Sequence, residues 1–337
     1  MYQADRVELA HGGGGRKTQQ LIKAVFQKHF ANNILDQMLD AAIFDIAGSK
    51  LAFSTDSFVI NPIFFPGGDI GKLAVYGTVN DVAVSGAKPY YMSAGIIIEE
   101  GFLLEDLQRI AASMALAAQI AGVQIVAGDT KVVEKGAVDK IFINTSALGV
   151  VRAGIALHPA KIKPGDAIIV NGSMGEHGLV IETSRRAFTL ATPVQSDCAS
   201  LLPLAQVMLQ FGDKLRCMRD ATRGGLATTL NELAVQSGLT FAIEQELLPI
   251  SPTVVGACKL LGLDPLYLAN EGKLVAIVDP DCVDALIREM HLVKGGENTC
   301  VVGRVTCDLP GMVELKTLLG VWRVLPMLEG EMLPRLC

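Results

Sequence analysis

Short apolar runs alternate with helix-like stretches in this sequence, and that alternation limits the folds it can adopt. Residues 50–55, 91–100, 123–128 and 140–151 are rich in apolar side chains over lengths typical of strands. Between them, residues 103–122 carry apolar side chains at helical spacing and end on a glycine. The apolar positions of this helix are Leu103, Leu107, Ile110, Met114 and Ala118. The pattern predicts a mixed α+β or α/β unit.

A cluster of turn residues near the middle of the chain predicts a domain boundary. Pro159, Pro164 and Gly165 precede a fresh strand at 166–170. A length of 337 residues also suggests two domains of ~150 residues each. From about Cys307 the chain becomes apolar with interspersed proline and glycine, which is too apolar for a solvated tail, so we expect it to dock. The expected division is a domain at 1–158, a domain at 159–306 and a C-terminal tail at 307–337.

Charge and hydropathy argue against several classes of function. The net charge is −6, and neither sign forms a long run, which argues against nucleic acid or an anionic membrane as the main partner. The longest apolar stretches have the length of strands and are too short to span a bilayer. The first residues lack the basic and apolar regions of a signal peptide. We therefore expect a cytoplasmic protein.

The cysteines do not form a metal or disulfide framework. The sequence has seven, all in its second half, and no CxxC pair. A disulfide-rich fold or a zinc ribbon requires a different pattern, so we expect six of them to be structural residues. Cys337 differs because it is the last residue of the sequence, which raises the question of a thiol at a free end.

Acidic residues at or near the ends of apolar runs carry the first chemical signal. Four aspartates in the first half each stand close to Gly, Thr or Asn, and they are Asp56, Asp69, Asp81 and Asp129. Turn chemistry explains any one of them. Together they are candidate ligands for Mg²⁺, which favours carboxylate oxygens and retains substrate phosphates. Lys72, Asn80 and Lys131 are their polar neighbours, and lysines in such loops can neutralise phosphate.

Two glycine-containing stretches are candidates for binding phosphate. The N-terminal "HGGGGRK" includes Gly13 and Gly14 and supplies backbone N–H groups, but it is not a P-loop, and a flexible N-terminus is an equally good interpretation. "RDATRGGLATTLNE" places Asp220 and Arg223 before a helical run, where the start of a helix beside an arginine forms an anion site. The residues alone therefore indicate an enzyme that uses ATP and Mg²⁺, without naming its substrate.

The sequence resembles the HypE family of hydrogenase maturation proteins, which are carbamoyl dehydratases. This family lies in the superfamily of aminoimidazole ribonucleotide synthetase and selenophosphate synthetase. The resemblance covers nearly the whole chain through "LAHGGGG", "AFSTDSFVINPIFFPGGDIGKLAVYGTVNDVAVSGA", "VAGDTKVVEKG", "INTSALG", "RDATRGGLA", "ANEGKLVAIV" and "PRLC". Departures are small: Gly13 stands where the family often has serine, and Leu336 where isoleucine is common.

The resemblance implies a fold, a reaction and partners. It implies two domains, a homodimer formed through the N-terminal sheet, and ATP bound near that interface. It implies that a HypF-type transferase places a carbamoyl group on Cys337. ATP then drives dehydration of this group to S-cyanide, which passes to iron on a HypC–HypD complex for the [NiFe] hydrogenase centre.

The same resemblance suggests roles for individual residues. Phosphorylating the amide oxygen makes it a leaving group, and a base must then remove protons from the nitrogen. Asp56, Asp69, Asp81 and Asp129 suit metal and phosphate binding, with Lys72 as a charge partner. We expect Glu271 to be the base, with Lys131 assisting. From Pro326 to Cys337 is 337 − 326 = 11 steps, so an extended tail reaches ~36 Å and can serve two sites.

Two other functions remain open at this stage. One is a small-molecule kinase or synthetase of the same superfamily, such as a thiamine-phosphate kinase or a selenophosphate synthetase. The latter would carry a reactive cysteine or selenocysteine near the N-terminal glycines, and this chain has neither before Cys198. The other is a non-enzymatic carrier whose ATP site regulates docking.

Overall fold

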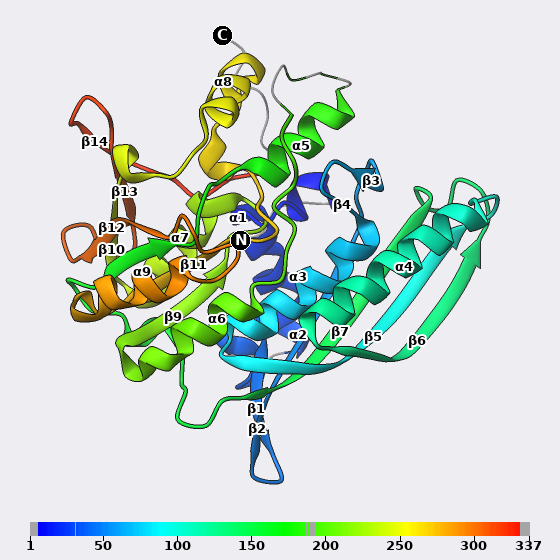
Figure 1. Ribbon diagram of the computed structural model, residues 1–337, viewed down its shortest axis with the longest axis horizontal. Coiled ribbons are helices and arrows are strands. Elements are labelled where there is room, and N and C mark those ends of the chain that lie inside the picture. Colours follow the sequence, from blue (N-terminus) through cyan, green and yellow to red (C-terminus); the bar gives the residue numbers. More distant parts are fainter. Residues whose placement is uncertain (1–5, 31, 187, 189, 191–192, 331–337) are drawn as a thin grey trace.

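The computed structural model describes residues 6–30, 32–186, 188, 190 and 193–330. Cys337 and Leu336 lie outside the described residues. Figure 1 shows two sheets, one on each side of the molecule, with helix α3 (Ile70–Val84) between them. The expected mixed α+β architecture is confirmed. In the described part of the chain, no helix combines the length and the apolar character needed to cross a bilayer.

The N-terminal sheet has five strands in the order β1-β2-β7-β5-β6. Their bounds are Ala42–Ile46 for β1, Ser49–Phe58 for β2, Ile141–Val151 for β7, Ala87–Glu99 for β5 and Gln124–Val133 for β6. Only the β5–β6 pair among these is parallel. The four strands expected from apolar runs are therefore present. A two-stranded ribbon of β3 (Phe64–Phe65) and β4 (Gly68–Asp69) leads into α3.

Helices α3 and α4 (Leu104–Ala121) lie over the same face of this sheet (Figure 1). The prediction of a helix at 103–122 is confirmed, and it ends where Gly122 adopts a left-handed φ of 66°. Helix α3 was not predicted. It is buried on nearly every side, because it packs on the N-terminal sheet and also against the second domain.

The C-terminal sheet has seven strands in the order β14-β13-β10-β12-β8-β11-β9. Their bounds are Trp322–Val324, Val313–Lys316, Thr240–Glu244, Cys300–Thr306, Ala167–Val170, Leu274–Val278 and Leu215–Asp220, in that order. The helices of this half are α5 (Glu176–Arg185), α6 (Leu202–Met208), α7 (Gly225–Ser237), α8 (Pro252–Leu261) and α9 (Val283–His291).

The two halves share one hydrophobic core. Val75 and Val79 of α3 belong to the same buried cluster as Leu201 and Leu204, which lie at and within α6. Burial of apolar surface on both sides therefore fixes α3 relative to the C-terminal domain. This matters for function because side chains from both halves meet beside α3.

The segment expected to form a tail from residue 307 is part of the second domain over most of its length. Strands β13 and β14 extend the C-terminal sheet, and Leu325 is fully buried. The chain then runs to the N-terminal segment, where α1 (Arg16–Leu21) continues through a π-helical stretch, Ile22–Gln27, into α2 (Lys28–Phe30). The Arg16 N–H donates to the Leu328 carbonyl at 2.8 Å. The part of the chain that is separate from the sheet thus begins after Leu325.

Candidate active site

Two adjoining cavities lie between the domains. The first, here called the glutamate cavity, has a volume of about 470 Å³. It is lined by Glu271, by the end of β2, by α5 and by Leu328 and Gly330, which belong to the last described residues and are here called the chain end. The second, here called the aspartate cavity, has a volume of about 400 Å³ and lies toward α1 and β9. Asp56, Thr222 and Arg223 line both cavities, so the two spaces meet at these side chains.

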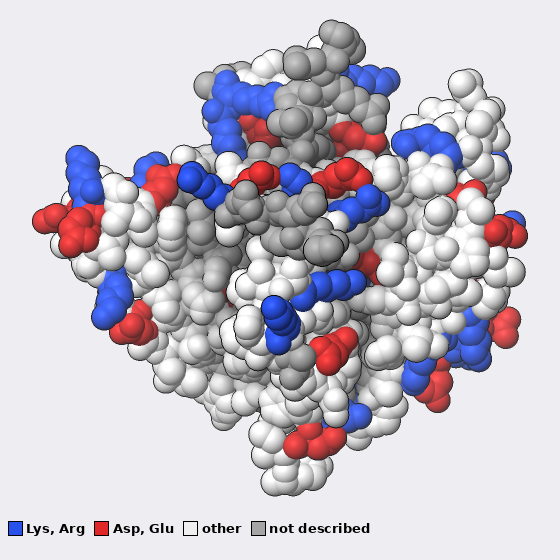
Figure 2. Space-filling model, turned by 180° about the vertical axis from the view of Figure 1, so that it is seen from behind, with Lys and Arg blue, Asp and Glu red and all other residues white. Residues whose placement is uncertain are grey.

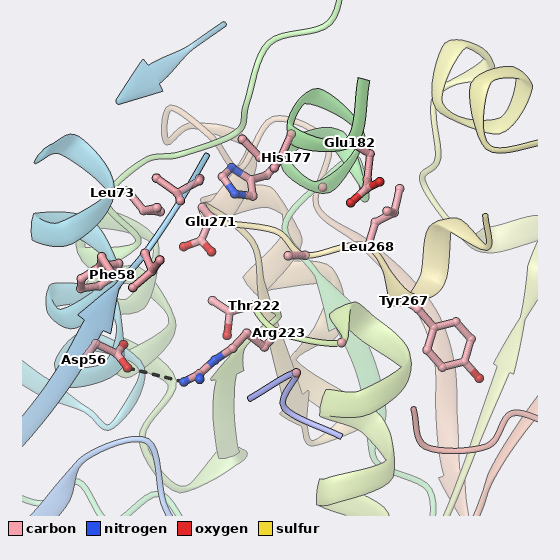
Figure 3. Close-up of a pocket in the computed structure, with 18 of the residues that line it drawn as sticks. Asp56, Phe58, Leu73, His177, Glu182, Thr222, Arg223, Tyr267, Leu268 and Glu271 are labelled. Carbon is pink, nitrogen blue, oxygen red and sulfur yellow. Dashed lines mark ion pairs between the residues drawn. The ribbon is translucent and has the colours of Figure 1, made fainter. Parts of the chain in front are cut away.

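The glutamate cavity combines apolar walls with a few polar groups. Its apolar lining includes Phe58, Ile60, Leu73, Ile181 and Leu268. Figure 3 shows Glu271, His177 and Arg223 projecting into the same space, with Asp56 paired to Arg223 at 3.6 Å. Apolar walls with a few convergent polar groups are typical of a ligand site.

The aspartate cavity holds a cluster of carboxylates. Asp40, Asp81 and Asp220 place oxygen atoms within 4.8 Å of one another, and Asp56 lies at the edge of the cluster. They come from four separate parts of the chain: Asp40 precedes β1, Asp56 lies in β2, Asp81 in α3 and Asp220 at the end of β9. Ser54 donates a hydrogen bond to Asp81 at 2.7 Å. The fold therefore brings together acidic groups that are as much as 180 positions apart, since 220 − 40 = 180.

Burial and mutual repulsion perturb these carboxyls. Burial, together with neighbouring carboxylates, raises the pKa of Asp220 to about 8 and that of Asp40 to about 6, even though Arg219 acts to lower both. Burial also raises the pKa of Asp81 well above its usual value, with Asp220, Asp56 and Asp40 adding to the effect. Arg219 forms an ion pair with Asp40 but also pairs with Glu232 at 2.8 Å, so its charge is shared. Such a crowded set of hard oxygen donors fits a divalent cation such as Mg²⁺.

Glu271 is half-buried in the wall of the glutamate cavity. Burial raises its pKa well above the usual value, and the charges of Asp220, Asp197 and Asp56 raise it further, while Arg223 lowers it. Positive charge brought into this space would therefore favour its ionised form. Its carboxyl is in position to exchange a proton with a group bound in the cavity.

The glycine-rich loop lies between Arg223 and the chain end. Gly14 has a φ of +80°, and a Cβ there would lie 2.7 Å from the Cβ of Arg223. A Cβ on Gly15 would lie 2.1 Å from the Leu328 carbonyl oxygen. Gly13 lines the glutamate cavity and Gly14 the aspartate cavity. Glycines are required here because two other parts of the backbone approach closely.

Several residues predicted for the site have other contacts. Asp69 caps the N-terminus of α3 by accepting from the Gly71 and Lys72 N–H groups at 2.7 and 3.0 Å. The Lys72 ammonium donates to the Gly67 carbonyl at 2.7 Å. Asn80 is only 2% exposed and uses its amide for hydrogen bonds with backbone groups of the C-terminal domain. The structure therefore does not bring these three side chains into the carboxylate cluster.

Asp129 and Lys131 lie on β6, at the edge of the N-terminal sheet. We expected a strand to end before Asp129, but β6 continues to Val133 because it pairs with β5 over its whole length. Both side chains are exposed, and within one chain they lie apart from the aspartate cluster. Any part they play in the site requires a second chain to be placed against this edge.

Other residues of the site were not predicted from the sequence. Asp40 stands in no recognisable motif, and only the fold brings it beside Asp81. His177, in the stretch "GEHG", lies in the glutamate cavity and contacts Ser196 Oγ at 2.8 Å through its Nδ1 atom. Burial lowers the pKa of His177 to about 4, with the charge of Arg185 adding to the shift, so its ring is neutral at physiological pH. A histidine between two glycines at the start of a helix, as in "GEHG", is the sequence signal that indicates a site residue here.

Comparisons with known proteins agree with this architecture. The chain matches the family models "AIR synthase related protein, N-terminal domain" over residues 38–151 and "AIR synthase related protein, C-terminal domain" over residues 163–311. It is 49% identical to carbamoyl dehydratase HypE of Cupriavidus necator over 98% of this chain and 95% of that protein.

Solved structures give the same result. A HypE–HypF complex contains a chain that is 44% identical, with a TM-score of 0.87 over 91% of this chain and 99% of that one. The structure of HypE in complex with ATP is 46% identical, with a TM-score of 0.81 over 98% of this chain and 100% of that one. The resemblance inferred from the motifs is confirmed, and the chain belongs to the HypE family of AIR-synthase-related proteins.

Proposed function

We propose that this chain is an ATP-dependent carbamoyl dehydratase that converts an S-carbamoyl group on Cys337 to S-cyanide. The observation that carries the proposal is the position of the chain end: Leu328 and Gly330 line the cavity that holds Glu271. Cys337 lies 337 − 330 = 7 residues further on, outside the described residues, and seven residues can extend ~25 Å. The names of the relatives, and the ATP bound to one of them, support the same reaction.

ATP has a suitable place where the two cavities meet. Arg223 offers a guanidinium to phosphate, the backbone of Gly14 lies against it, and Gly13 lines the glutamate cavity with it. Because Arg223 pairs with Asp56 at 3.6 Å while its side chain is 63% exposed, its charge stays available to a ligand. The apolar walls beside Phe58 and Leu268 suit the adenine ring of ATP or the C-terminal tail.

Magnesium fits the aspartate cavity. We propose Asp40, Asp81, Asp220 and Asp56 as the residues that hold it, because their carboxyl groups line one cavity and the pKa of each is raised. When bound, the ion would neutralise phosphate charge and favour the ionised carboxylates. Of the four aspartates expected from the sequence, Asp56 and Asp81 lie here, whereas Asp69 caps α3.

The reaction requires a base, and Glu271 is the proposed one. The amide oxygen of the carbamoyl group attacks the γ-phosphorus of ATP, and ADP leaves. The nitrogen then loses two protons in turn, the C–O bond breaks, and phosphate departs with its electron pair as the nitrile forms. Glu271 accepts a proton from nitrogen once nearby positive charge has lowered its raised pKa.

A homodimer would bring a further cation to the site. Strand β6 is the edge of its sheet, and its exposed side chains include Val126 at 59% and Val132 at 67%. Figure 2, which views the molecule from behind, shows large areas without charged side chains. We propose that this edge and the open face of the sheet meet a second copy, so that Asp129 and Lys131 reach the partner's site and Lys131 assists Glu271.

Two protein partners complete the proposed cycle. A HypF-type transferase would load Cys337, in keeping with the HypE–HypF complex found among the related structures. A HypC–HypD complex would receive the cyanide for the iron centre of [NiFe] hydrogenase. Both steps need Cys337 to reach another protein. The contacts that hold the segment after Leu325, from the Tyr267 hydroxyl to the Pro326 carbonyl and from the Arg16 N–H to the Leu328 carbonyl, would then open.

Single-turnover ATP hydrolysis separates this enzyme from a carrier that uses ATP only for docking. Carbamoylated and unmodified protein would be mixed with ATP and magnesium, and ADP measured over time. Stoichiometric ADP formation that depends on the carbamoyl group supports the dehydratase. Equal hydrolysis by both forms would favour the carrier or a kinase with another substrate.

A further inference from the structure

Glu271 is held by its backbone, while its carboxyl projects into the glutamate cavity (Figure 3). Its N–H donates to Asp197 Oδ1 at 3.0 Å, and its carbonyl accepts from the Ala199 N–H at 3.2 Å. A Cβ on the next residue, Gly272, would lie 2.0 Å from the Asp197 carbonyl oxygen. The backbone at Glu271 is thus pressed against residues 197–199 with no room for another side chain beside it.

Three buried asparagines fix this segment from different directions. Asn270 accepts from the Gly175 N–H at 2.7 Å and donates to the carbonyls of Ala221 and Leu268 at 2.9 and 3.1 Å. Asn171 donates to the Gly272 carbonyl at 3.2 Å and accepts from the Leu274 N–H at 2.8 Å. All three, Asn80, Asn171 and Asn270, are 2% exposed or less.

Asn80 is the member of this set that comes from the other domain. From α3, its Nδ2 group donates to the carbonyls of Ala199 at 3.0 Å and Glu271 at 3.5 Å. Its Oδ1 atom accepts from the Leu201 N–H at 2.7 Å. Both N–H groups of the amide are therefore used, which leaves no donor for a phosphate oxygen.

We propose that Asn80 is a positioning residue that sets Glu271 relative to the carboxylate cluster, rather than a ligand of ATP. Its neighbour on α3 is Asp81, which belongs to that cluster. One rigid helix therefore places the metal-binding carboxylate and holds the backbone of the base. This inference rests on the proposed role of Glu271. It gives the Asn80 side chain a structural role, since Asn80 takes no part in the chemical steps proposed above.

The chemistry of the amide explains why asparagine is needed at this position. Asn80→Asp keeps an acceptor for Leu201 but points a carboxylate oxygen at two carbonyls that need a donor. Asn80→Ala removes all three bonds. In both variants Glu271 loses its tie to α3, and displacement of a catalytic group by ~1 Å can lower a rate about 100-fold.

The test compares rate, ATP affinity and stability in the full-length protein. Carbamoylated Asn80→Ala, Asn80→Asp and Glu271→Gln variants are mixed with saturating ATP and magnesium, and loss of water from the tail is followed by intact mass. We expect the Asn80 variants to lose about 10- to 100-fold in single-turnover rate, with ATP Kd changed by less than about twofold. Thr240→Val is the control, because it removes one partly buried hydrogen bond, donated by the Leu309 N–H at 2.7 Å, in a strand that lines neither cavity.

The double variant separates positioning from general loss of structure. Adding Asn80→Ala to Glu271→Gln should cost little further rate, because the residue being positioned no longer acts. If Asn80→Ala does not fold, Asn80→Asp carries the same comparison, because it keeps the acceptor for the Leu201 N–H and removes only the two N–H donors. A large loss of ATP affinity, full additivity with Glu271→Gln, or a rate loss matched by an equally destabilised Thr240→Val would overturn the inference.

The same variants distinguish the inference from the proposed function. An unaffected rate in Glu271→Gln would overturn the role of Glu271 and, with it, the positioning by Asn80. A rate abolished in Glu271→Gln but unchanged in Asn80→Ala would overturn the positioning alone.

Discussion

Replacing Gly15 by alanine should release the chain end from the glycine-rich loop. The new Cβ would lie 2.1 Å from the Leu328 carbonyl oxygen and 2.8 Å from its carbon, and both are backbone atoms that cannot rotate away. Gly15 itself has a φ of −86° and a ψ of −160°, which alanine adopts readily, so the effect comes from the contact alone. The expected consequence is a lost hydrogen bond between Arg16 and Leu328.

The loss of docking free energy can be worked out from the two interactions that hold the chain end against Arg16. The Arg16–Leu328 backbone hydrogen bond is worth about 1 kcal/mol net. The Arg16–Glu329 ion pair at 2.7 Å is more than half exposed and adds less than about 1 kcal/mol. The docked end should therefore lose about 1–2 kcal/mol, which corresponds to about a 5- to 30-fold shift toward the undocked state.

Hydrogen exchange at the Arg16 amide measures this shift directly, since that amide donates to Leu328. We expect faster exchange by about the same factor, slower dehydration of the carbamoylated tail, and loading by the transferase at an undiminished rate. Gly12→Ala is the matched control, because a Cβ there meets only Leu9 O at an ordinary 3.5 Å. If Gly15→Ala and Gly12→Ala exchange at the same rate, the chain end is not held as described.

Three further predictions follow from the site and the sheet. Mg²⁺ should raise the Tm in a thermal melt, and Asp81→Asn should remove most of that shift, because the carboxylates of the aspartate cavity would no longer gather the ion; an undiminished shift would place the metal elsewhere. His177 has a folded-state pKa of about 4 against 6.5 in the unfolded chain, so its contribution is present above pH 6.5 and is lost as pH falls toward 4. The free energy of unfolding, measured with denaturant, should therefore fall between pH 7 and pH 5 by about 1–2 kcal/mol less in His177→Gln than in the wild type. An identical pH dependence of the two proteins would refute this. Val126→Glu on β6 should yield monomers in light scattering and slow dehydration, whereas a persistent dimer would move the interface away from this edge.

Periodicity in the sequence predicted the elements that have two different faces. Helix α4 has one buried and one exposed side, so its spacing was readable, and Gly122 marked its end. Helix α3 has buried residues all round, because it packs against both domains, and its sequence therefore shows no polar face. Asn80 and Asp81 therefore lie inside a helix, although the sequence indicated only that they stand near the end of an apolar run.

The candidate site was predictable only in part, for a physical reason. Local sequence identified Asp56, Asp81, Asp220 and Arg223 as acidic or basic residues beside strands and glycines, and the fold gathers them. It could not identify Asp40, because only the folded chain places this residue beside Arg219 and Asp220 of β9 and Asp81 of α3. Nor could the sequence show whether Asp69 caps a helix or binds a metal, since an aspartate suits either role.

Intact-mass analysis of the carbamoylated protein tests the central claim most directly. The protein would be incubated with a HypF-type transferase, carbamoyl phosphate and ATP, and then with magnesium. The expected result is a carbamoyl adduct on Cys337 that loses one water, with Glu271→Gln retaining the adduct unchanged. An unmodified Cys337, or an adduct on another residue, would contradict the account.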